Sequence, residues 1–341
     1  MRVGITLLPE LAWALDRQRW QAVEAYGYDH AWTFDHLAWR SLADSPWYAT
    51  VPTLAAAALS TTTLRLGTWV ATPNFRHPVP FAKELMTLDH LSGGRLNVGL
   101  GAGTDGFDAT MLGSSASAGE WSLTGGVGGR PPSGSSASAS EWNSTGGVGG
   151  RPPSTDSQPG LSPGRRHARF VEFVDVLARV LGQPETTWSG DWYTVEGART
   201  VPACVQGPHP PFVVAANGPK GMRLALERGA AWVTTTGAAP DASPEEWWAA
   251  AEDKAARFER MAEARAAAGD AVPDDFARYL NLEARTSGFG SAEHVVDAVG
   301  RAAALGYTDV VLAWPRPDGV MAGDPGLLEA VAARLPEIHA H

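Results

Sequence analysis

Short apolar runs recur along the chain between alanine-rich segments with helical periodicity, and this alternation constrains the fold more than any other feature. The runs do not alternate polar with apolar residues, which is typical of parallel strands buried on both faces. Helices between such strands supply the right-handed crossovers that a parallel sheet requires. The predicted strands are Val3–Leu7, His30–Phe34, Leu64–Ala71, Leu96–Gly101, Phe212–Ala216, Ala231–Thr236, Arg278–Leu282 and Asp309–Trp314.

Eight such runs match the strand number of an α/β TIM barrel, (β/α)8, and 341 residues accommodate one barrel domain over residues 1–341. Most of the predicted helices stop at a glycine, which is a common C-terminal signal. Periodicity alone does not close the sheet into a barrel, so the prediction of closure depends on the number of strands and on the family resemblance described below. The predicted helices are Asp16–Tyr26, Thr53–Ser60, Val79–Leu91, Arg165–Leu181, Pro219–Arg228, Pro244–Ala268, Ala292–Leu305 and Gly326–Leu335.

Residues 114–160 differ from the rest because they contain a tandem repeat. Ser114–Ser133 and Ser135–Ser154 are identical at 17 of 20 positions and are rich in Ser, Gly and Pro. Such a stretch buries too little apolar surface to offset its ordering entropy. We therefore expect a duplicated, low-complexity loop insertion after strand four, with disorder favoured over a lid in which Trp121 and Trp142 cover the barrel mouth.

The charge and cysteine content exclude several classes of function. A net charge of −10 argues against nucleic acid or an anionic membrane as a partner. The single cysteine, Cys204, rules out internal disulfides, and no His-x-x-x-His or Cys-x-x-Cys spacing indicates a metal site. The first residues already form a predicted strand, and no apolar run is long enough for a membrane span, so we expect a cytoplasmic protein.

In a (β/α)8 barrel the functional side chains follow the carboxyl ends of the strands. After predicted strand two come Asp35 and His36, and then Trp39. A carboxylate beside an imidazole can form a proton relay near neutral pH. The alternative is that His36 merely hydrogen-bonds a neighbouring loop.

Polar and small residues follow the next two strands. Thr72 and Asn74 suit the polar edge of a heteroaromatic ring, whereas Arg76 and His77 either join them or anchor the loop. Gly101, Ala102 and Gly103 let a ligand approach the backbone closely, although tight barrel packing also selects glycine.

Two later strand ends carry groups suited to anions. Asn217, Gly218, Pro219 and Lys220 open a helix and form a natural phosphate seat; the alternative is an ordinary turn with proline at the first helical position. After strand eight, Arg316 either orients an anionic substrate or cofactor tail, or pairs with Asp318 at the surface.

Two blocks of sequence carry a resemblance to a known family. Ala82–Gly103, which contains TLDHLSGGRLNVGLGAG, resembles the signature of the luciferase-like monooxygenase family, whose members use flavin or deazaflavin. Pro211–Thr235, PFVVAANGPKGMRLALERGAAWVTT, is similar to a second family block, and Asp35-His36 matches members that use deazaflavin. Within the first block, Asp89, Ser92 and Arg95 are expected to hold a helix-to-strand turn rather than to touch a cofactor.

The resemblance implies a cofactor lying across the barrel mouth. His36 would be the acid–base group beside the ring, Thr72 and Asn74 would flank the ring, Gly101–Gly103 would line it, and Gly218–Lys220 would hold the phosphate. Deazaflavin members often have a non-proline cis peptide near strand three. Many members have a Glu after the strand-four glycines; here the acids are Asp105 and Asp108, so Asp108 becomes a candidate catalytic carboxylate.

The resemblance leads to three hypotheses. The first is an oxidoreductase that transfers hydride between reduced deazaflavin (coenzyme F-420) and a small organic substrate contacted by Trp39 and Arg316. The second is an FMN-dependent two-component monooxygenase served by a flavin reductase. The third is a non-catalytic barrel that binds a ligand or partner. A homodimer is also expected from the family.

Overall fold

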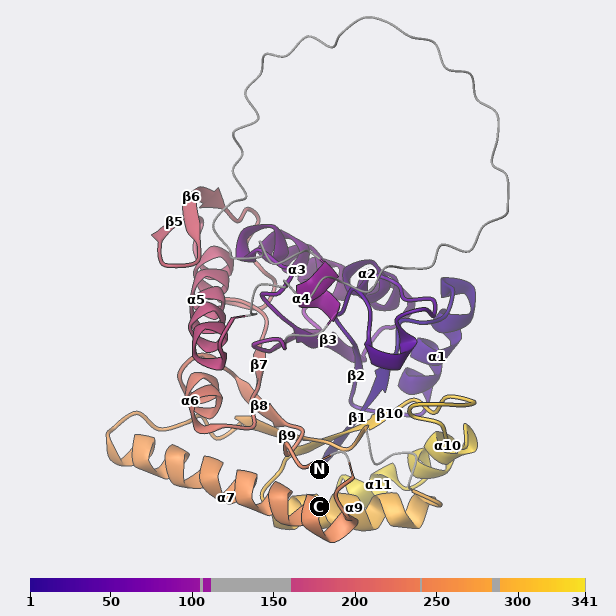
Figure 1. Ribbon diagram of the computed structural model, residues 1–341. Helices are drawn as coiled ribbons and strands as arrows, with labels where there is room; N and C mark the ends of the chain where they lie inside the picture. The colour runs from indigo at the N-terminus through magenta and orange to yellow at the C-terminus, as the bar shows by residue number, and fades with distance from the viewer. Residues whose placement is uncertain (105–106, 112–160, 240, 284–288, 341) are drawn as a thin grey trace, which may run out of the picture.

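Eight parallel strands close into a barrel, as the sequence predicts. The computed structural model describes residues 1–104, 107–111, 161–239, 241–283 and 289–340, so the tandem repeat and Asp105 lie outside the described residues. The strands are hydrogen-bonded in the closed order β1-β10-β9-β8-β7-β4-β3-β2, and Figure 1 looks into this ring. Their bounds are β1 Arg2–Leu7, β2 His30–Thr33, β3 Arg65–Ala71, β4 Leu96–Leu100, β7 Phe212–Ala215, β8 Ala231–Thr234, β9 Ala277–Asn281 and β10 Asp309–Ala313.

The helices surround the barrel, and those that were predicted agree to within a few residues at each end (Figure 1). The short helices η1 and α4 were not predicted. The predicted tail helix is divided into α10 and α11. The bounds are α1 Trp13–Ala25, η1 Arg40–Leu42, α2 Thr50–Ser60, α3 Pro78–Ser92, α4 Phe107–Met111, α5 Pro163–Gly182, α6 Pro219–Arg228, α7 Pro244–Ala267, α9 Ala292–Ala304, α10 Gly326–Ala332 and α11 Leu335–Ile338.

An antiparallel hairpin stands apart from the barrel and was not predicted. Strands β5 Glu185–Ser189 and β6 Thr194–Arg199 pair only with each other. The sequence does contain a signal for them. Residues that favour strands, among them Thr and Trp in 186–188 and Tyr, Thr and Val in 193–195, come before and after a Gly-Asp turn at 190–191. Tyr193 and Val195 are buried, which anchors the hairpin against the barrel's helices.

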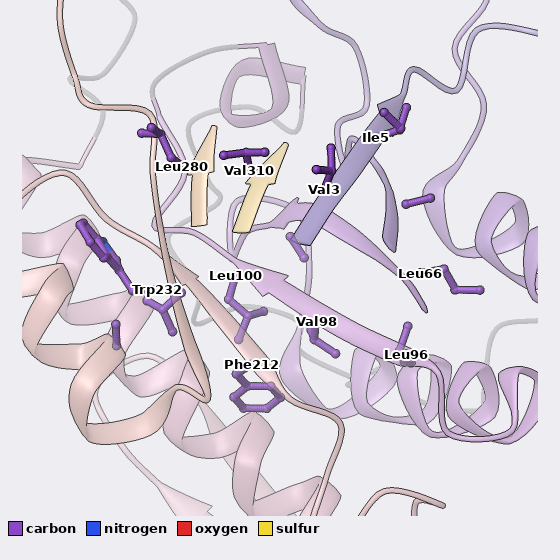
Figure 2. Close-up of a cluster of buried hydrophobic side chains, with 14 of the residues drawn as sticks. Val3, Ile5, Leu66, Leu96, Val98, Leu100, Phe212, Trp232, Leu280 and Val310 are labelled. Atoms are coloured by element: carbon purple, nitrogen blue, oxygen red, sulfur yellow. The ribbon is translucent and has the colours of Figure 1, made fainter. Parts of the chain in front are cut away.

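The main core lies between the strands and the helices. Alternate residues of β1 and β4 point outward into it, including Val3, Ile5, Val98 and Leu100, and Figure 2 shows these side chains gathered around the strands. Residues of the opposite parity point into the barrel, as the two-residue period of a strand requires. Burial on both faces explains why the strands lack polar alternation.

Large aromatic side chains fill the barrel interior. The rings of Trp32 and Trp69 lie 4.7 Å apart, and Tyr279 packs 5.8 Å from Trp32. Glycines make room for them: a Cβ at Gly67 would come within 2.7 Å of the Trp32 ring, and one at Gly4 within 1.7 Å of His30. The interior is therefore a packed core, and polar chemistry is confined to its ends.

The segment from α3 to β4 forms the structural turn that the sequence predicts. The Arg95 guanidinium donates to the carbonyl oxygens of Ala58 and Leu64, each at 2.7 Å, and the Ser92 hydroxyl donates to the Asp89 carbonyl at 3.1 Å. The Asp89 carboxylate accepts from the backbone and side chain of Gln206. Near the carboxyl end of β3, the Trp69–Val70 peptide is cis, in the strand where the resemblance places such a bond. Among the described residues, no helix combines the length and apolarity that crossing a bilayer demands.

Glu24 ties α1 to the loop before β3 and gives the first testable prediction. Burial by itself raises the pKa of this carboxyl, but hydrogen bonds from the backbone N–H groups of Thr63, Leu64 and Thr62 outweigh it and lower the pKa from 4.5 to about 2. A carboxyl with a lowered folded-state pKa stabilises the protein above its unfolded value, and this contribution is lost as the pH falls. Between pH 4.5 and about 2, acid titrations followed by circular dichroism should show a shallower loss of stability in Glu24→Gln than in the wild type. Equal slopes in both proteins would contradict the assignment.

Candidate functional site

The predicted cofactor residues lie on one arc of the barrel rim. His36 follows β2, Thr72 follows β3, Gly101 follows β4 and Asn217 follows β7, and these four strands are consecutive in the closed sheet. Their carboxyl ends therefore bring together residues that are as many as 181 positions apart in the chain, from His36 to Asn217. Arg316 follows β10, which lies on the opposite side of the barrel.

His36 is held by Asp108. The His36 Nδ1 lies 2.5 Å from Asp108 Oδ2, and the other carboxylate oxygen accepts from the Leu37 backbone N–H at 2.7 Å. Because an ionised carboxylate can only accept, the imidazole donates from Nδ1 and keeps Nε2 for proton exchange. The His36 side chain is 27% exposed and the Asp108 side chain 8%, so the imidazole reaches solvent while its partner is buried. The arrangement is that of a positioned acid–base group.

Asp35 does not take part in this pair, which corrects the predicted relay between neighbours. Its carboxylate accepts two hydrogen bonds from Arg76, from Nε at 2.6 Å and from Nη2 at 2.7 Å. Asp35 is 1% exposed. Burial by itself lowers the pKa of Arg76, but Asp35, with Glu84, outweighs it and raises that pKa. Asp35 and Arg76 thus form a buried ion pair that joins the ends of β2 and β3, and Arg76 takes the anchoring role among the sequence alternatives.

Aromatic residues pack beside His36. The Trp47 indole N–H donates to the His36 carbonyl oxygen at 2.9 Å, and Trp39 stacks on Trp47 with ring centres 6.3 Å apart. Phe34 contacts both His36 and Trp39 edge to face. Trp39, which the sequence analysis expected to contact substrate, is instead buried among these rings. It packs against Phe34 and Trp47, the two aromatic residues that contact His36.

The ends of β3 and β4 hold each other through Asn74. Its side-chain NH2 donates to the Thr104 carbonyl oxygen at 2.9 Å, and its carbonyl oxygen accepts from Arg169 at 2.6 Å. The Thr72 hydroxyl accepts from the Asn74 backbone N–H at 3.3 Å. Asn74 therefore joins the two loops to α5, whereas the sequence analysis expected its side chain to flank the cofactor ring. Arg169, which sequence reasoning did not single out, is the residue that fixes it.

The glycines after β4 are required by close packing. A Cβ at Gly101 would lie 2.7 Å from Val70 Cγ2, and one at Gly103 would lie 2.6 Å from the Asn74 amide nitrogen. Gly103 also has φ +73°, in the left-handed region. Of the two interpretations of these glycines, the structure shows the packing requirement; Ala102 and Gly103 are both partly exposed at the rim.

The start of α6 fits a phosphate group. Gly218 is the N-cap residue of α6, so no side chain caps the first backbone N–H groups of the helix, and Pro219 lies in the first turn. Asn217, Gly218, Pro219 and Lys220 are all exposed. No atom lies within 4 Å of a Cβ built at Gly218. The unpaired N–H groups of a first helical turn, with Lys220 beside them, suit an anion. Asn217 is held by Thr234 and Thr235, whose hydroxyls contact its side chain at 2.8 and 2.9 Å.

Arg316 is engaged within its own loops, which corrects both predicted roles. Its Nε donates to Glu10 Oε2 at 2.9 Å, and Nη1 donates to the carbonyl oxygens of Asp318 and Val320 at 3.0 and 3.1 Å. The partner is thus Glu10, not the Asp318 carboxylate. With Nε and Nη1 engaged in this way, Arg316 joins the ends of β1 and β10 and acts as a structural anchor in this structure.

The described residues offer no metal centre, and their one described cavity of note lies away from the rim. Within the described ranges, no group of three or more His, Cys, Asp or Glu side chains is placed to hold a metal ion. A cavity of about 480 Å³ lies between α7 and α9, where it is lined by Glu252, Arg278 and Tyr307 among others. Its residues come from the amino end of β9 and the segment before β10, away from the rim that carries His36.

The eight parallel strands, closed into a ring and alternating with helices, define the class of fold to which this chain belongs, a TIM barrel, and its carboxyl-end rim carries the His36–Asp108 pair. Comparison with known sequences identifies the family within this class. The pattern of the luciferase-like monooxygenase family matches residues 1–121 and 146–272. The chain belongs to the luciferase-like monooxygenase family.

The relatives include two kinds of oxidoreductase. The chain is 27% identical to 4-hydroxyprotoasukamycin monooxygenase of Streptomyces nodosus subsp. asukaensis, over 65% of this chain and 47% of that protein. It is 28% identical to F420-dependent glucose-6-phosphate dehydrogenase of Beutenbergia cavernae, over 70% of this chain and 57% of that protein. The chain thus spans about half the length of the curated relatives it matches.

Solved structures share the same fold. The F420-dependent tetrahydromethanopterin reductase of Methanopyrus kandleri superposes with a TM-score of 0.68 at 18% identity, over 99% of both chains. At this identity the similarity establishes the fold, a TIM barrel, and no more.

Proposed function

We propose that this protein is an oxidoreductase that transfers hydride between a reduced deazaflavin, coenzyme F-420, and a small organic substrate. The observation that carries the proposal is the His36–Asp108 pair, because Asp108 fixes the imidazole and leaves its Nε2 available at the rim. Hydride transfer to or from a polar C=C, C=N or C–OH group needs a proton partner near neutral pH, and a positioned histidine supplies one.

Each group of rim residues would have a separate role. When bound, the deazaflavin would supply the hydride chemistry at its ring. His36 would donate a proton from Nε2 to a substrate being reduced, or accept the hydroxyl proton of an alcohol being oxidised. Asp108 would keep the imidazole oriented, and Thr72, Ala102 and Gly103 would line the ring. The first turn of α6, with Lys220, would bind the phosphate.

One alternative is an FMN-dependent monooxygenase that receives reduced flavin from a separate reductase, because one of the relatives is a monooxygenase. The Asp35-His36 sequence supports deazaflavin in preference, whereas the start of α6 would suit the phosphate of either cofactor. The expected homodimer stays a prediction, which sedimentation analysis would test.

Spectroscopic titration tests the proposed coenzyme. Coenzyme F-420 should bind, seen as quenching of its fluorescence, with FMN binding at least tenfold more weakly. Lys220→Gln should weaken coenzyme binding about tenfold, since a charge-assisted contact to phosphate contributes roughly 1.5 kcal/mol. Arg17→Gln, which removes an exposed cation from α1, is the matched control.

Two results would oppose the proposal. Binding of FMN with oxygen consumption would favour the monooxygenase. Binding of neither compound would favour a barrel without catalytic function.

A further inference from the structure

A column of side chains runs through the barrel interior from its amino end toward the rim. Asp309 begins β10, His30 begins β2, and Trp32 lies two residues further along β2. Trp69 lies near the carboxyl end of β3, where the centre of its ring is 4.7 Å from that of Trp32. Thr72, a proposed coenzyme contact, follows three residues later. Trp69 is therefore the large interior side chain next below this part of the rim.

The hydrogen bonds of the column fix the state of the His30 imidazole. The Trp32 indole N–H, which can only donate, is bonded to His30 Nδ1 at 2.7 Å. His30 Nε2 lies 3.1 Å from the Asp309 carboxylate, which also accepts two hydrogen bonds of 2.8 Å from Arg2. Burial by itself raises the pKa of Asp309, but hydrogen bonds from His30 and Arg2 outweigh it and lower that pKa, so the carboxylate only accepts. His30 is therefore neutral, with its proton on Nε2.

Packing holds the imidazole in this orientation. His30 is 2% exposed, and its ring centre lies 5.3 Å from that of Tyr279 and 5.5 Å from that of Trp32. A Cβ at Gly4 would come within 1.7 Å of His30 Nδ1, so only glycine at this position of β1 leaves room for the ring. A buried polar group without a partner is costly, which keeps both ring nitrogens in their hydrogen bonds. Trp32 is thus fixed through its indole nitrogen.

We propose that His30 is a positioning residue for the coenzyme ring and that it acts through Trp32 on Trp69. The inference rests on the proposed function, because it concerns the same rim site. The planes of Trp32 and Trp69 are tilted by 43°, and Tyr279 contacts both rings. Because a close-packed interior leaves little free volume, a shift of Trp32 is passed on to Trp69. A hydrogen bond at the amino end of the barrel thereby sets the surface beneath a ring bound at the opposite end.

The first measurement needs no coenzyme. Two tilted indoles at this distance couple their electronic transitions and give a paired positive and negative band in circular dichroism, a couplet. The difference between the spectra of the wild type and Trp69→Phe isolates the couplet of this pair. His30→Leu, which removes the acceptor of the Trp32 N–H, should lose most of the couplet. His30→Gln should retain it, because an amide can both accept from Trp32 and donate to Asp309.

The second measurement is the Kd of coenzyme F-420 from fluorescence quenching. His30→Leu should weaken binding about tenfold, the upper end of the effect of one aromatic contact, and His30→Gln should stay within about twofold of the wild type. Tyr28→Phe is the matched control. It removes a buried hydrogen bond of 2.7 Å, from the Tyr28 hydroxyl to the Leu328 carbonyl oxygen, outside the barrel interior, and should change neither measurement.

The outcomes separate the inference from the function beneath it. An unchanged couplet in His30→Leu would overturn the positioning role, and a lost couplet with an unchanged Kd would overturn its link to the coenzyme. Failure of the wild type to bind coenzyme would instead refute the proposed function, on which the inference depends. If His30→Leu does not fold, Trp32→Phe removes the same N–H group and should weaken coenzyme binding to a similar extent; an unchanged Kd in that variant would also overturn the inference.

Discussion

Replacing His36 with alanine should lower turnover about a hundredfold or more while leaving the Kd of the coenzyme within about twofold. One acid–base group accounts for a factor of roughly 100 to 10,000 in rate. The His36 imidazole is partly exposed at the rim, whereas the phosphate seat at the start of α6 follows β7, three strands further along the arc from β2. Stopped-flow reoxidation of reduced F-420 by a panel of enones, imines and ketones measures the rate.

Asp108→Asn gives the sharper version of the same test. The amide would present an N–H group to His36 Nδ1 where the carboxylate now accepts, and so would favour the opposite tautomer, with the proton on Nε2. We expect kcat to fall at least tenfold with KM little changed, and the pH dependence of kcat to shift. Asp175→Asn is the matched control, because Asp175 pairs with Arg228 on the surface between α5 and α6. Unchanged turnover in His36→Ala would remove His36 from the mechanism.

Asp35→Asn should lower the free energy of unfolding by about 3 kcal/mol. Removing one partner of a buried ion pair leaves the other charge uncompensated, which typically costs about 3–5 kcal/mol. The Arg76 side chain is 13% exposed and keeps a second partner, Glu84, at 2.9 Å, so the expected value lies at the lower end. Urea unfolding followed by tryptophan fluorescence measures it.

Two further variants isolate the buried pair. Glu84→Gln, which removes the exposed partner, should cost less than about 1 kcal/mol. Asp35→Asn/Arg76→Gln replaces the pair with neutral groups and should recover part of the loss. The relay that the sequence suggests makes the opposite prediction for Asp35→Asn: slower turnover with unchanged stability. That result would return Asp35 to the catalytic group.

The fold follows from the sequence because its signals are local or periodic. Buried runs such as Asp309–Ala313 lack polar alternation, and Pro219 with Gly229 delimits α6 in the sequence as in the structure. Hairpin β5–β6 was missed because its strands are short and half polar, so their pattern is weak beside that of the barrel strands. Barrel closure needed the strand count and the family resemblance as well.

The sequence by itself determined the eight strands, the helices between them and the set of strand ends where polar residues gather. Only the tertiary structure decided which of those residues act together. Successive residues leave a strand end in different directions, so Asp35 turns to Arg76 while His36 turns to Asp108, 72 positions away. A hydrogen bond depends on distances of a few ångströms between side chains, and such distances between remote segments are set by packing rather than by spacing along the chain.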